Sequence, residues 1–291
     1  MTYRVIQWAT GAVGKYSIAA LHHNPAFELV GCWVHGAAKE GRDVGEILGR
    51  APLGLRATRD VDALLALRAD CVVYSPVVGK SAEVARILAS GANVVTPVGW
   101  VYPLRSVDLS EISAACGKGR STLHGTGIHP GGITERFPLM LSALSRAITH
   151  VRAEEFSDIR TYAAPDVVGG IMQFGKTPDE ARRSPMLAIL GAGFMQSIDM
   201  LAAELGLELE PHKRQTHEIA LATAALHDTP IGTIEAGRVA AQRFTWQGLV
   251  RGEPVISVRV NWLMGEAHLD PAWSFGAGGE RFEVEISGDP S

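Results

Sequence analysis

The residues near the start of the chain that are best suited to chemistry form a glycine-containing turn directly after a short apolar segment. Ala9, Gly11 and Gly14 have the spacing Ala-x-Gly-x-x-Gly, with alanine where a dinucleotide-binding turn usually has its first glycine. Gly11 would let the main chain approach a pyrophosphate, and Gly14 would let the following helix pack close to the strand. The N–H groups at a helix start favour phosphate oxygens. The expected dinucleotide contacts here are Thr10, Gly11, Ala12, Val13 and Gly14.

The second apolar segment ends without the acidic residue that NAD-binding folds place against the ribose hydroxyls. The loop after Val34 carries His35, Lys39 and Arg42, and basic side chains suit the 2′-phosphate of NADP better than a free hydroxyl pair. A solvated loop would have the same composition, and Glu40 is the residue that could favour NAD instead. NADP is therefore the expected cofactor, with NAD as the alternative.

Further cofactor contacts are expected in the loops after the third and fourth apolar segments. Open α/β sheets bind their ligands at the carboxyl ends of the strands. Ser75, Pro76, Thr96 and Pro97 occupy these places. The alternative for the two prolines is that they only end the strands.

Transfer of a hydride from a nicotinamide usually also requires a proton donor or acceptor near the substrate heteroatom. His129 and Tyr102 are the candidate catalytic residues, and a pKa near neutrality would suit His129 to this work. The alternative is a histidine that bonds the backbone of a glycine-rich hinge. The candidate substrate-pocket residues are Trp100, Tyr102, His129 and Phe174. The density of apolar residues in the second half of the chain that could form pocket walls favours a rather hydrophobic substrate, although such residues usually form core: Phe156, Met172, Phe174, Phe194, Met195 and Trp262.

Other polar residues have ordinary structural explanations. His124 ends a predicted strand and is more typical of a core residue, and Glu135 suits a helix start as well as it suits a general acid. His212 and His217 have a poor spacing for a metal and lack an obvious third ligand, so no metal site is expected.

The elements that must position these residues alternate in the first part of the chain. Strands are expected at 3–9, 28–35, 70–74, 93–96 and 121–125, and helices at 14–23, 60–67, 81–90 and 108–118. This alternation is typical of βαβ units, and it predicts a Rossmann domain, a doubly wound parallel sheet, over residues 1–128.

A Pro/Gly-rich elbow at 129–132 begins a second domain, 129–291, with a different pattern. Its expected strands are 151–159, 207–216, 232–246, 255–263 and 281–286, and its expected helices are 137–146 and 185–205. Alternation of apolar and polar residues predicts half-buried antiparallel strands. The second domain is therefore expected to be α+β, with an open, largely antiparallel sheet.

The composition narrows the class of protein. The chain has 291 residues, 46% of them hydrophobic, a formal net charge of -4 and three cysteines. The sequence has no long basic run for nucleic acid, no secretory leader and no run of about 18 apolar residues that would span a bilayer. We expect a cytoplasmic enzyme with reduced thiols and a small-molecule substrate, with neither nucleic acid nor membrane as a partner.

Five segments together resemble the dihydrodipicolinate-reductase-like superfamily, and within it the branch of 2,4-diaminopentanoate dehydrogenase and the native NADP-dependent amine dehydrogenases. These segments are Gln7–Gly14, Lys39–Gly45, Ala69–Tyr74, Asn93–Thr96 and Gly125–Gly131. The resemblance implies a homodimer formed through the faces of the second-domain sheets.

One departure from this branch bears on function. The resemblance implies a glutamate just after the fourth strand, where it orients ammonia, but residues 96–103 contain no carboxylate and the next one is Asp108. The paired-histidine-plus-lysine motif of the dihydrodipicolinate reductases is also missing from the sequence. We therefore expect an NADP(H)-dependent oxidoreductase acting on a C=O or C=N bond of a small substrate in an interdomain cleft. The alternatives are an amine dehydrogenase that uses another group for ammonia and a dinucleotide-binding sensor without turnover.

Overall fold

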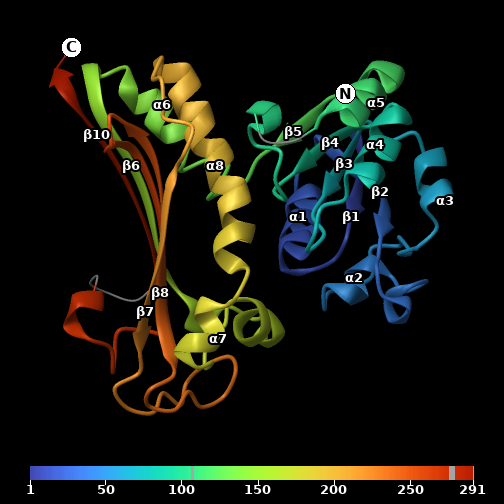
Figure 1. Ribbon diagram of the computed structural model, residues 1–291. Helices are drawn as coiled ribbons and strands as arrows, with labels where there is room; N and C mark the ends of the chain where they lie inside the picture. The colour runs from blue at the N-terminus through green and yellow to red at the C-terminus, as the bar shows by residue number, and fades with distance from the viewer. Residues whose placement is uncertain (106–107, 275–278, 291) are drawn as a thin grey trace. The chain divides into compact units, whose positions relative to one another are not determined.

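The computed structural model describes residues 1–105, 108–274 and 279–290 (Figure 1). The chain divides into two units, Met1–Gly127 and Ile128–Ser291, each with its own sheet and its own core.

The sheet of the first unit is parallel throughout. Strand β1 (Tyr3–Trp8) pairs with β2 (Phe27–Trp33) on one side and with β3 (Cys71–Tyr74) on the other. Strands β4 (Asn93–Thr96) and β5 (Leu123–Gly125) continue the sheet beyond β3, which gives the order β2-β1-β3-β4-β5. The predicted doubly wound sheet is confirmed. Its winding reverses between β1 and β3, the place where such sheets bind ligands.

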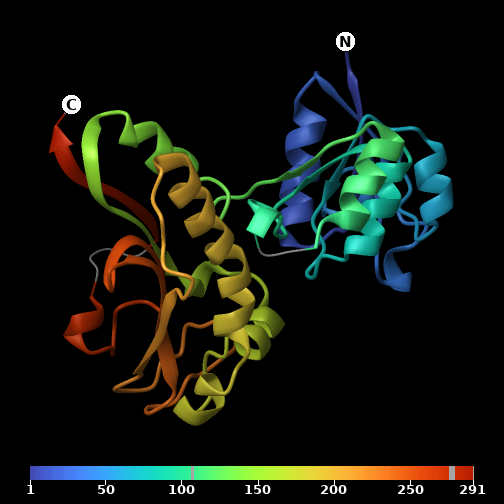
Figure 2. The same ribbon diagram turned by 45° about the horizontal axis from the view of Figure 1, so that its top comes forward.

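Helices cover both faces of this sheet (Figure 2). On one face, α1 (Ala12–His23) contributes Ile18 to a core with Cys32 and Val34. The other face is covered by α3 (Val61–Ala66), α4 (Ser81–Ala89) and α5 (Ser110–Gly119). The short helix α2 (Val44–Ile47) and 3-10 turns at Ala37–Lys39 and Pro103–Arg105 complete the described part of the unit.

The turn from β1 into α1 is very tight. Ala9 has a φ of 76°, the left-handed conformation that side chains disfavour, and it holds the position of the missing first glycine. A Cβ on Gly14 would lie 2.2 Å from the carbonyl oxygen of Ala9, so only glycine allows the first turn of α1 to pack here. The Gln7 side chain donates from Nε2 to that same oxygen at 3.0 Å.

The second unit contains a mixed sheet of order β10-β6-β9-β8-β7. Its strands are β6 (Ser145–Asp158), β7 (Arg214–Leu221), β8 (Val239–Val250), β9 (Glu253–Leu263) and β10 (Glu280–Pro290). Only β6 and β9 pair in parallel among these strands; the other neighbours are antiparallel. The predicted α+β architecture with a largely antiparallel sheet is confirmed.

One face of this sheet is covered by helix α8 (Met186–Leu205), whose Phe194, Ile198 and Leu201 share a core with Trp246. By length and apolar composition alone α8 could cross a membrane, the one such helix among the described residues. Half of that stretch is buried within the unit, as in an ordinary core helix. The unit also contains α6 (Arg136–Ser142), α7 (Pro178–Arg182), 3-10 turns at Ile159–Thr161 and Pro271–Trp273, and a π-helical turn at Val167–Ile171.

Several boundaries differ from those expected. The strand expected at 207–216 is wrong over its first part, because the segment after α8 and its C-cap Gly206 stays outside the strand ladder, which begins only at Arg214. The strand expected from residue 232 begins at Val239, after a turn in which Arg238 N–H bonds the carbonyl of Glu235. The helix expected to reach residue 146 ends at Ser142, because residues from Ser145 onward pair with β10.

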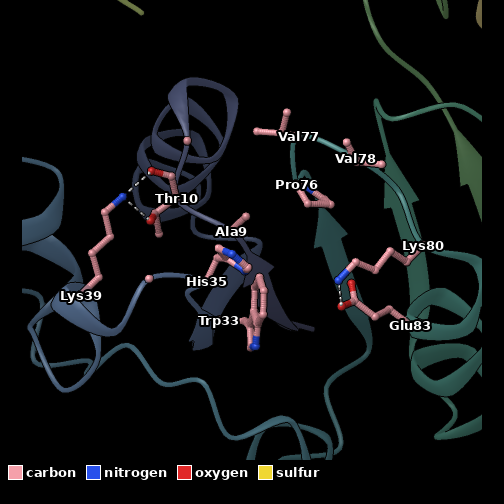
Figure 3. Close-up of a pocket in the computed structure, with 12 residues that line it drawn as sticks. Ala9, Thr10, Trp33, His35, Lys39, Pro76, Val77, Val78, Lys80 and Glu83 are labelled. Atoms are coloured by element: carbon pink, nitrogen blue, oxygen red, sulfur yellow. Dashed lines mark hydrogen bonds and ion pairs between the residues drawn. The ribbon is translucent and has the colours of Figure 1, made fainter. Parts of the chain in front are cut away.

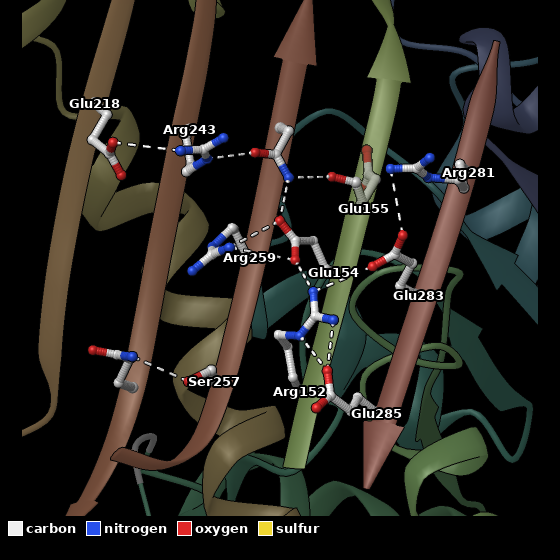
Figure 4. Close-up of polar contacts among 12 residues, drawn as sticks. Arg152, Glu154, Glu155, Glu218, Arg243, Ser257, Arg259, Arg281, Glu283 and Glu285 are labelled. Atoms are coloured by element: carbon white, nitrogen blue, oxygen red, sulfur yellow. Dashed lines mark hydrogen bonds and ion pairs between the residues drawn. The ribbon is translucent and has the colours of Figure 1, made fainter. Parts of the chain in front are cut away.

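The other face of the second sheet carries a network of charged and amide side chains (Figure 4). Residues i and i+2 of a strand share a face, so Arg152 and Glu154 point away from the α8 core that contains Val151. The Glu154 side chain is 3% exposed and accepts bonds from Arg152, Arg259 and Asn261. The network continues to the outer strands through Glu218, Arg243, Glu283 and Glu285.

The strained turn gives a prediction about stability. Ala9→Gly should stabilise the protein by about 1 kcal/mol, because glycine has no Cβ penalty at a positive φ. Ala20→Gly is the control with the same chemical change on the exposed side of α1, and it should destabilise the protein. Chemical denaturation measures the free energy of unfolding of both variants and of the unaltered protein. A loss of stability in Ala9→Gly would contradict the assignment of strain to Ala9.

Candidate functional site

A cavity of about 450 Å³ lies in the first unit at the carboxyl ends of β1, β2 and β3 (Figure 3). It is formed by the turn after β1, the loop after β2, and the loop and helix start after β3. Its lining residues are Ala9, Thr10, Gly11, Trp33, His35, Gly36, Lys39, Pro76, Val77, Val78, Lys80 and Glu83.

The start of helix α1 gives the cavity an anion-binding side. Gly11 is the N-cap of α1, and a Cβ built on it would meet nothing within 4 Å. The first turn of α1 carries no acidic residue, so the positive end of the helix dipole is not neutralised there. Backbone N–H groups at such a helix start are suited to a pyrophosphate.

A lysine stands next to these amides. The Nζ atom of Lys39 is 3.0 Å from Oγ1 of Thr10 and 3.3 Å from the Thr10 carbonyl oxygen (Figure 3). Glu40, the residue that could have favoured NAD, is not among the lining residues, and its carboxylate lies 3.9 Å from the guanidinium of Arg59. The charge that the loop after β2 presents to the cavity is therefore positive.

The middle of the cavity is apolar and flat. Trp33 lines it and stacks on Trp8, with ring centroids 5.0 Å apart and an interplanar angle of 12°. Val77 and Val78 lie in the loop after β3 and are 80% and 68% exposed, which is unusual for valine. A planar ligand would cover these apolar surfaces.

The far side of the cavity carries an ion pair that the sequence analysis missed. Nζ of Lys80 lies 3.3 Å from Oε1 of Glu83, and both residues line the cavity (Figure 3). The sequence did hold one indication of this pair. Lys80 and Glu83 are three residues apart, at the start of the helix that follows the third strand.

The structure brings together only part of the predicted cofactor set. Thr10, Gly11, His35, Lys39 and Pro76 line the cavity. Ala12, Val13 and Gly14 form the first turn of α1 and are not among the lining residues.

Arg42, Ser75, Thr96 and Pro97 are not among the lining residues. Ser75 is 8% exposed and bonds the side chain of Gln7 at 2.8 Å. Thr96 is fully buried and its hydroxyl accepts from Val98 N–H. The local hydrogen bonds of Ser75 and Thr96 give both side chains a structural role.

Trp100, Tyr102 and His124 line a second cavity of about 560 Å³ in the first unit, between the segment after β4, helix α5 and strand β5. Trp100 has a φ of 55° and its ring lies against Gly79, where an added Cβ would come within 2.8 Å of the ring. The structure therefore places two of the predicted substrate-pocket residues, Trp100 and Tyr102, around one space.

His129 lies in the interior of the second unit, with its side chain only 1% exposed. Its ring packs on Phe194 at 4.8 Å, and Nε2 lies 3.3 Å from the carbonyl oxygen of Arg259 and 4.0 Å from a carboxylate oxygen of Glu155. Burial lowers the pKa of His129 to about 4, so the ring is neutral at pH 7. The expectation of a pKa near neutrality is wrong, because the sequence does not show this burial.

Two other residues also lie in the interior of the second unit. Phe174 is 1% exposed in a core with Val168 and Ile234, so its ring has no surface to offer a substrate. Glu135 is 1% exposed and accepts from Gly131 N–H at 2.8 Å and from the Ser197 hydroxyl. Burial raises the pKa of Glu135, and its contacts hold the glycine-rich loop. Within the described residues, no group of three or more His, Cys, Asp or Glu could hold a metal ion.

Comparison with known proteins agrees with this geometry. The 2,4-diaminopentanoate dehydrogenase C-terminal domain family matches residues 133–262. An amine dehydrogenase from Streptomyces virginiae is 35% identical over 87% of this chain and 73% of that protein. The chain belongs to the amine dehydrogenase and 2,4-diaminopentanoate dehydrogenase family.

Other proteins resemble this amine dehydrogenase-family chain over a short segment or in fold alone. A 4-hydroxy-tetrahydrodipicolinate reductase from Synechocystis is 35% identical over 22% of this chain and 23% of its own length. The structure of an amine dehydrogenase from Mycobacterium smegmatis has the same fold, with a TM-score of 0.80 and 22% identity over 99% of this chain and 84% of that one. A biliverdin reductase from Synechocystis, solved with biliverdin and NADP+, aligns with a TM-score of 0.55 and 14% identity over 99% of this chain and 77% of its own.

The geometry of Gly11 and Gly14 predicts different effects for two similar substitutions. Gly11→Ala should fold normally, because its Cβ meets no protein atom, but it should weaken dinucleotide binding about tenfold or more by keeping phosphate from the backbone. Gly14→Ala should lower the melting temperature through its clash with Ala9, whereas the control Gly117→Ala on α5, where a Cβ meets no protein atom, should leave it unchanged or raise it. Thermal melts and titration with NADPH test this; normal binding in Gly11→Ala would contradict the site.

Proposed function

We propose that this protein is an NADP-dependent oxidoreductase that acts at the carbon–nitrogen bond of a small, rather apolar amine or of the corresponding imine. The observation that carries the proposal is the cavity at the carboxyl ends of β1, β2 and β3, beside the glycine-containing turn, in a chain 35% identical to an amine dehydrogenase. When bound, the dinucleotide supplies or accepts the hydride.

The residues present fit such a group. The open space above Gly11 and the first N–H groups of α1 suit a pyrophosphate, and the apolar surfaces of Trp33 and Val77 suit a planar ring. Lys39, held beside Thr10, is the residue that we propose for the 2′-phosphate, with His35 as its neighbour in the lining. NADP is favoured over NAD because Glu40 pairs with Arg59 outside the lining.

A residue of the chain must also donate a proton to the substrate heteroatom or accept one from it. Tyr102 remains our candidate for this role, because a phenol can donate and accept and because it shares a cavity with Trp100. We propose His129 as a positioning residue instead: its neutral ring is enclosed, and its buried Nδ1 atom has no hydrogen-bond partner among the described residues.

A specific observation favours a second candidate function, reduction of a carbonyl group without ammonia. Amine formation requires a group that orients ammonia, and residues 96–103 contain no carboxylate. The carbonyl and amine activities share the cofactor and the hydride step, and they differ in their requirement for ammonium.

We further propose that the protein acts as a homodimer in the cytoplasm. The network around Glu154 covers a sheet face with charges of both signs (Figure 4). Such a face can be complementary to itself across a two-fold axis. The free thiols of Cys32, Cys71 and Cys116 suit a reducing compartment.

The activity test follows the absorbance of reduced nicotinamide while small ketones and aldehydes are supplied with and without excess ammonium. The proposed function predicts oxidation of NADPH that depends on ammonium, and reduction of NADP+ by the matching amine. NADPH oxidation at the same rate with and without ammonium would indicate a carbonyl reductase. Tight NADPH binding without any turnover would contradict both the amine-forming and the carbonyl-reducing activity.

The assignment of Lys39 predicts a change in cofactor preference. Lys39→Ala should weaken binding of NADPH by about tenfold and leave binding of NADH nearly unchanged, because only NADPH offers a phosphate to the ammonium group. Arg42→Ala removes a positive charge from the same loop outside the cavity lining, and it should preserve the preference. Equal losses for both cofactors in Lys39→Ala would contradict the assignment.

A further inference from the structure

The pair formed by Lys80 and Glu83 on the wall of the dinucleotide cavity has no role in the function proposed above. Lys80 precedes helix α4 and Glu83 lies in its first turn, so both side chains come from one rigid helix start. The Glu83 side chain is 28% exposed and that of Lys80 is 62% exposed. Together they offer the cavity one hydrogen-bond donor group beside one acceptor group.

A buried phenol fixes the orientation of the carboxylate. The hydroxyl of Tyr74, a fully buried residue, donates to Oε2 of Glu83 at 2.8 Å and accepts from the N–H of Lys80 at 3.1 Å. Burial and the bond to Glu83 raise the pKa of Tyr74, so the phenol keeps its proton and remains a donor. Oε1 of Glu83 lies beside the ammonium group and takes no part in the contact with Tyr74.

The surfaces next to the pair are apolar. Pro76, Val77 and Val78 come from the loop after β3 and Trp33 from the end of β2 (Figure 3). An apolar slot with a donor and an acceptor at its edge suits a flat heteroaromatic ring. A sugar or an aliphatic chain would leave either the charges or the apolar walls without matching groups.

The position of the pair indicates which ring this would be. The cavity is lined from the ends of β1, β2 and β3, and none of its lining residues follows β4 or β5. In doubly wound sheets the end of the second strand contacts the adenosine ribose. The lining therefore belongs to the adenosine half of the site.

We propose that Lys80 and Glu83 recognise the edge of the adenine base: Glu83 accepts a hydrogen bond from the 6-amino group, and Lys80 donates to the adjacent ring nitrogen. This inference rests on the proposed dinucleotide function. An adenine edge presents a donor beside an acceptor, the complement of a carboxylate beside an ammonium group. A base with a carbonyl at the 6-position would bring two acceptors together at Glu83.

The test compares NADPH with its hypoxanthine analogue, which has a carbonyl in place of the 6-amino group. Binding constants are measured by titration with the wild-type protein, Glu83→Gln and Glu111→Gln. The wild-type protein should bind NADPH about tenfold more tightly than the analogue. Glu83→Gln should bring the two close to equal affinity, because an amide can donate to the carbonyl. Glu111, an exposed glutamate in the first turn of α5, gives the matched control, which should keep the wild-type ratio.

Wild-type affinities within about twofold of each other would overturn the inference. Equal losses for both ligands in Glu83→Gln would also overturn it, because they would show that Glu83 only supports the fold through Tyr74. Lys80→Met, at an exposed position, tests the other half of the pair and leaves the bond between Tyr74 and Glu83 in place. It should reduce the preference for NADPH over the hypoxanthine analogue several-fold. A wild-type protein that binds NADPH but does not discriminate leaves the proposed function standing, whereas one that binds neither NADPH nor NADH rejects the function itself.

Discussion

The close approach of helix α1 to the end of strand β1 is the constraint on which the site depends. The first turn of the helix passes so near the Ala9 carbonyl that a Cβ at Gly14 would come within 2.2 Å of it. This contact requires glycine at residue 14 and a left-handed conformation at Ala9. It also sets the backbone N–H groups after Gly11 at the cavity. Lys39 then bonds Thr10 within the same turn, which joins the loop after β2 to this arrangement.

The cavity has a different chemical character on each side. The helix start and Lys39 supply positive charge on one side, while Lys80 and Glu83 supply a paired donor and acceptor on the other (Figure 3). Between them lie Trp33 and the exposed valines. A phosphate-bearing ligand with a flat base satisfies all three surfaces at once, whereas an ordinary apolar metabolite would leave the charges unmatched.

Much of this arrangement could be predicted from the sequence, because local rules govern it. The spacing of Gly11 and Gly14 after an apolar strand is itself the geometric requirement of the turn, and the alternation of strands and helices defines a parallel sheet. The sequence alone also shows that no acidic residue directly follows Val34 and that the first charged side chain after it is that of Lys39 or a protonated His35. Each of these features depends on residues that lie close together in the sequence.

Features that depend on tertiary packing could not be predicted in the same way. The burial that makes His129 neutral comes from Phe194 and the sheet strands, far away in the sequence. Phe174 looks the same in a sequence whether it lines a pocket or fills a core. In the sequence, Glu83 looks like any acidic residue in the first turn of a helix. Only the hydrogen bond from Tyr74 in the structure shows that its carboxylate has a fixed orientation.

The central claim is that a dinucleotide binds across the carboxyl ends of β1, β2 and β3. Hydrogen–deuterium exchange with and without NADP+ tests it most directly, because each backbone amide reports its own protection. The account predicts slower exchange on adding NADP+ in three separate segments, residues 10–15, 35–39 and 76–80. Protection confined to the second unit, or an unchanged exchange pattern in all three segments at saturating NADP+, would contradict it.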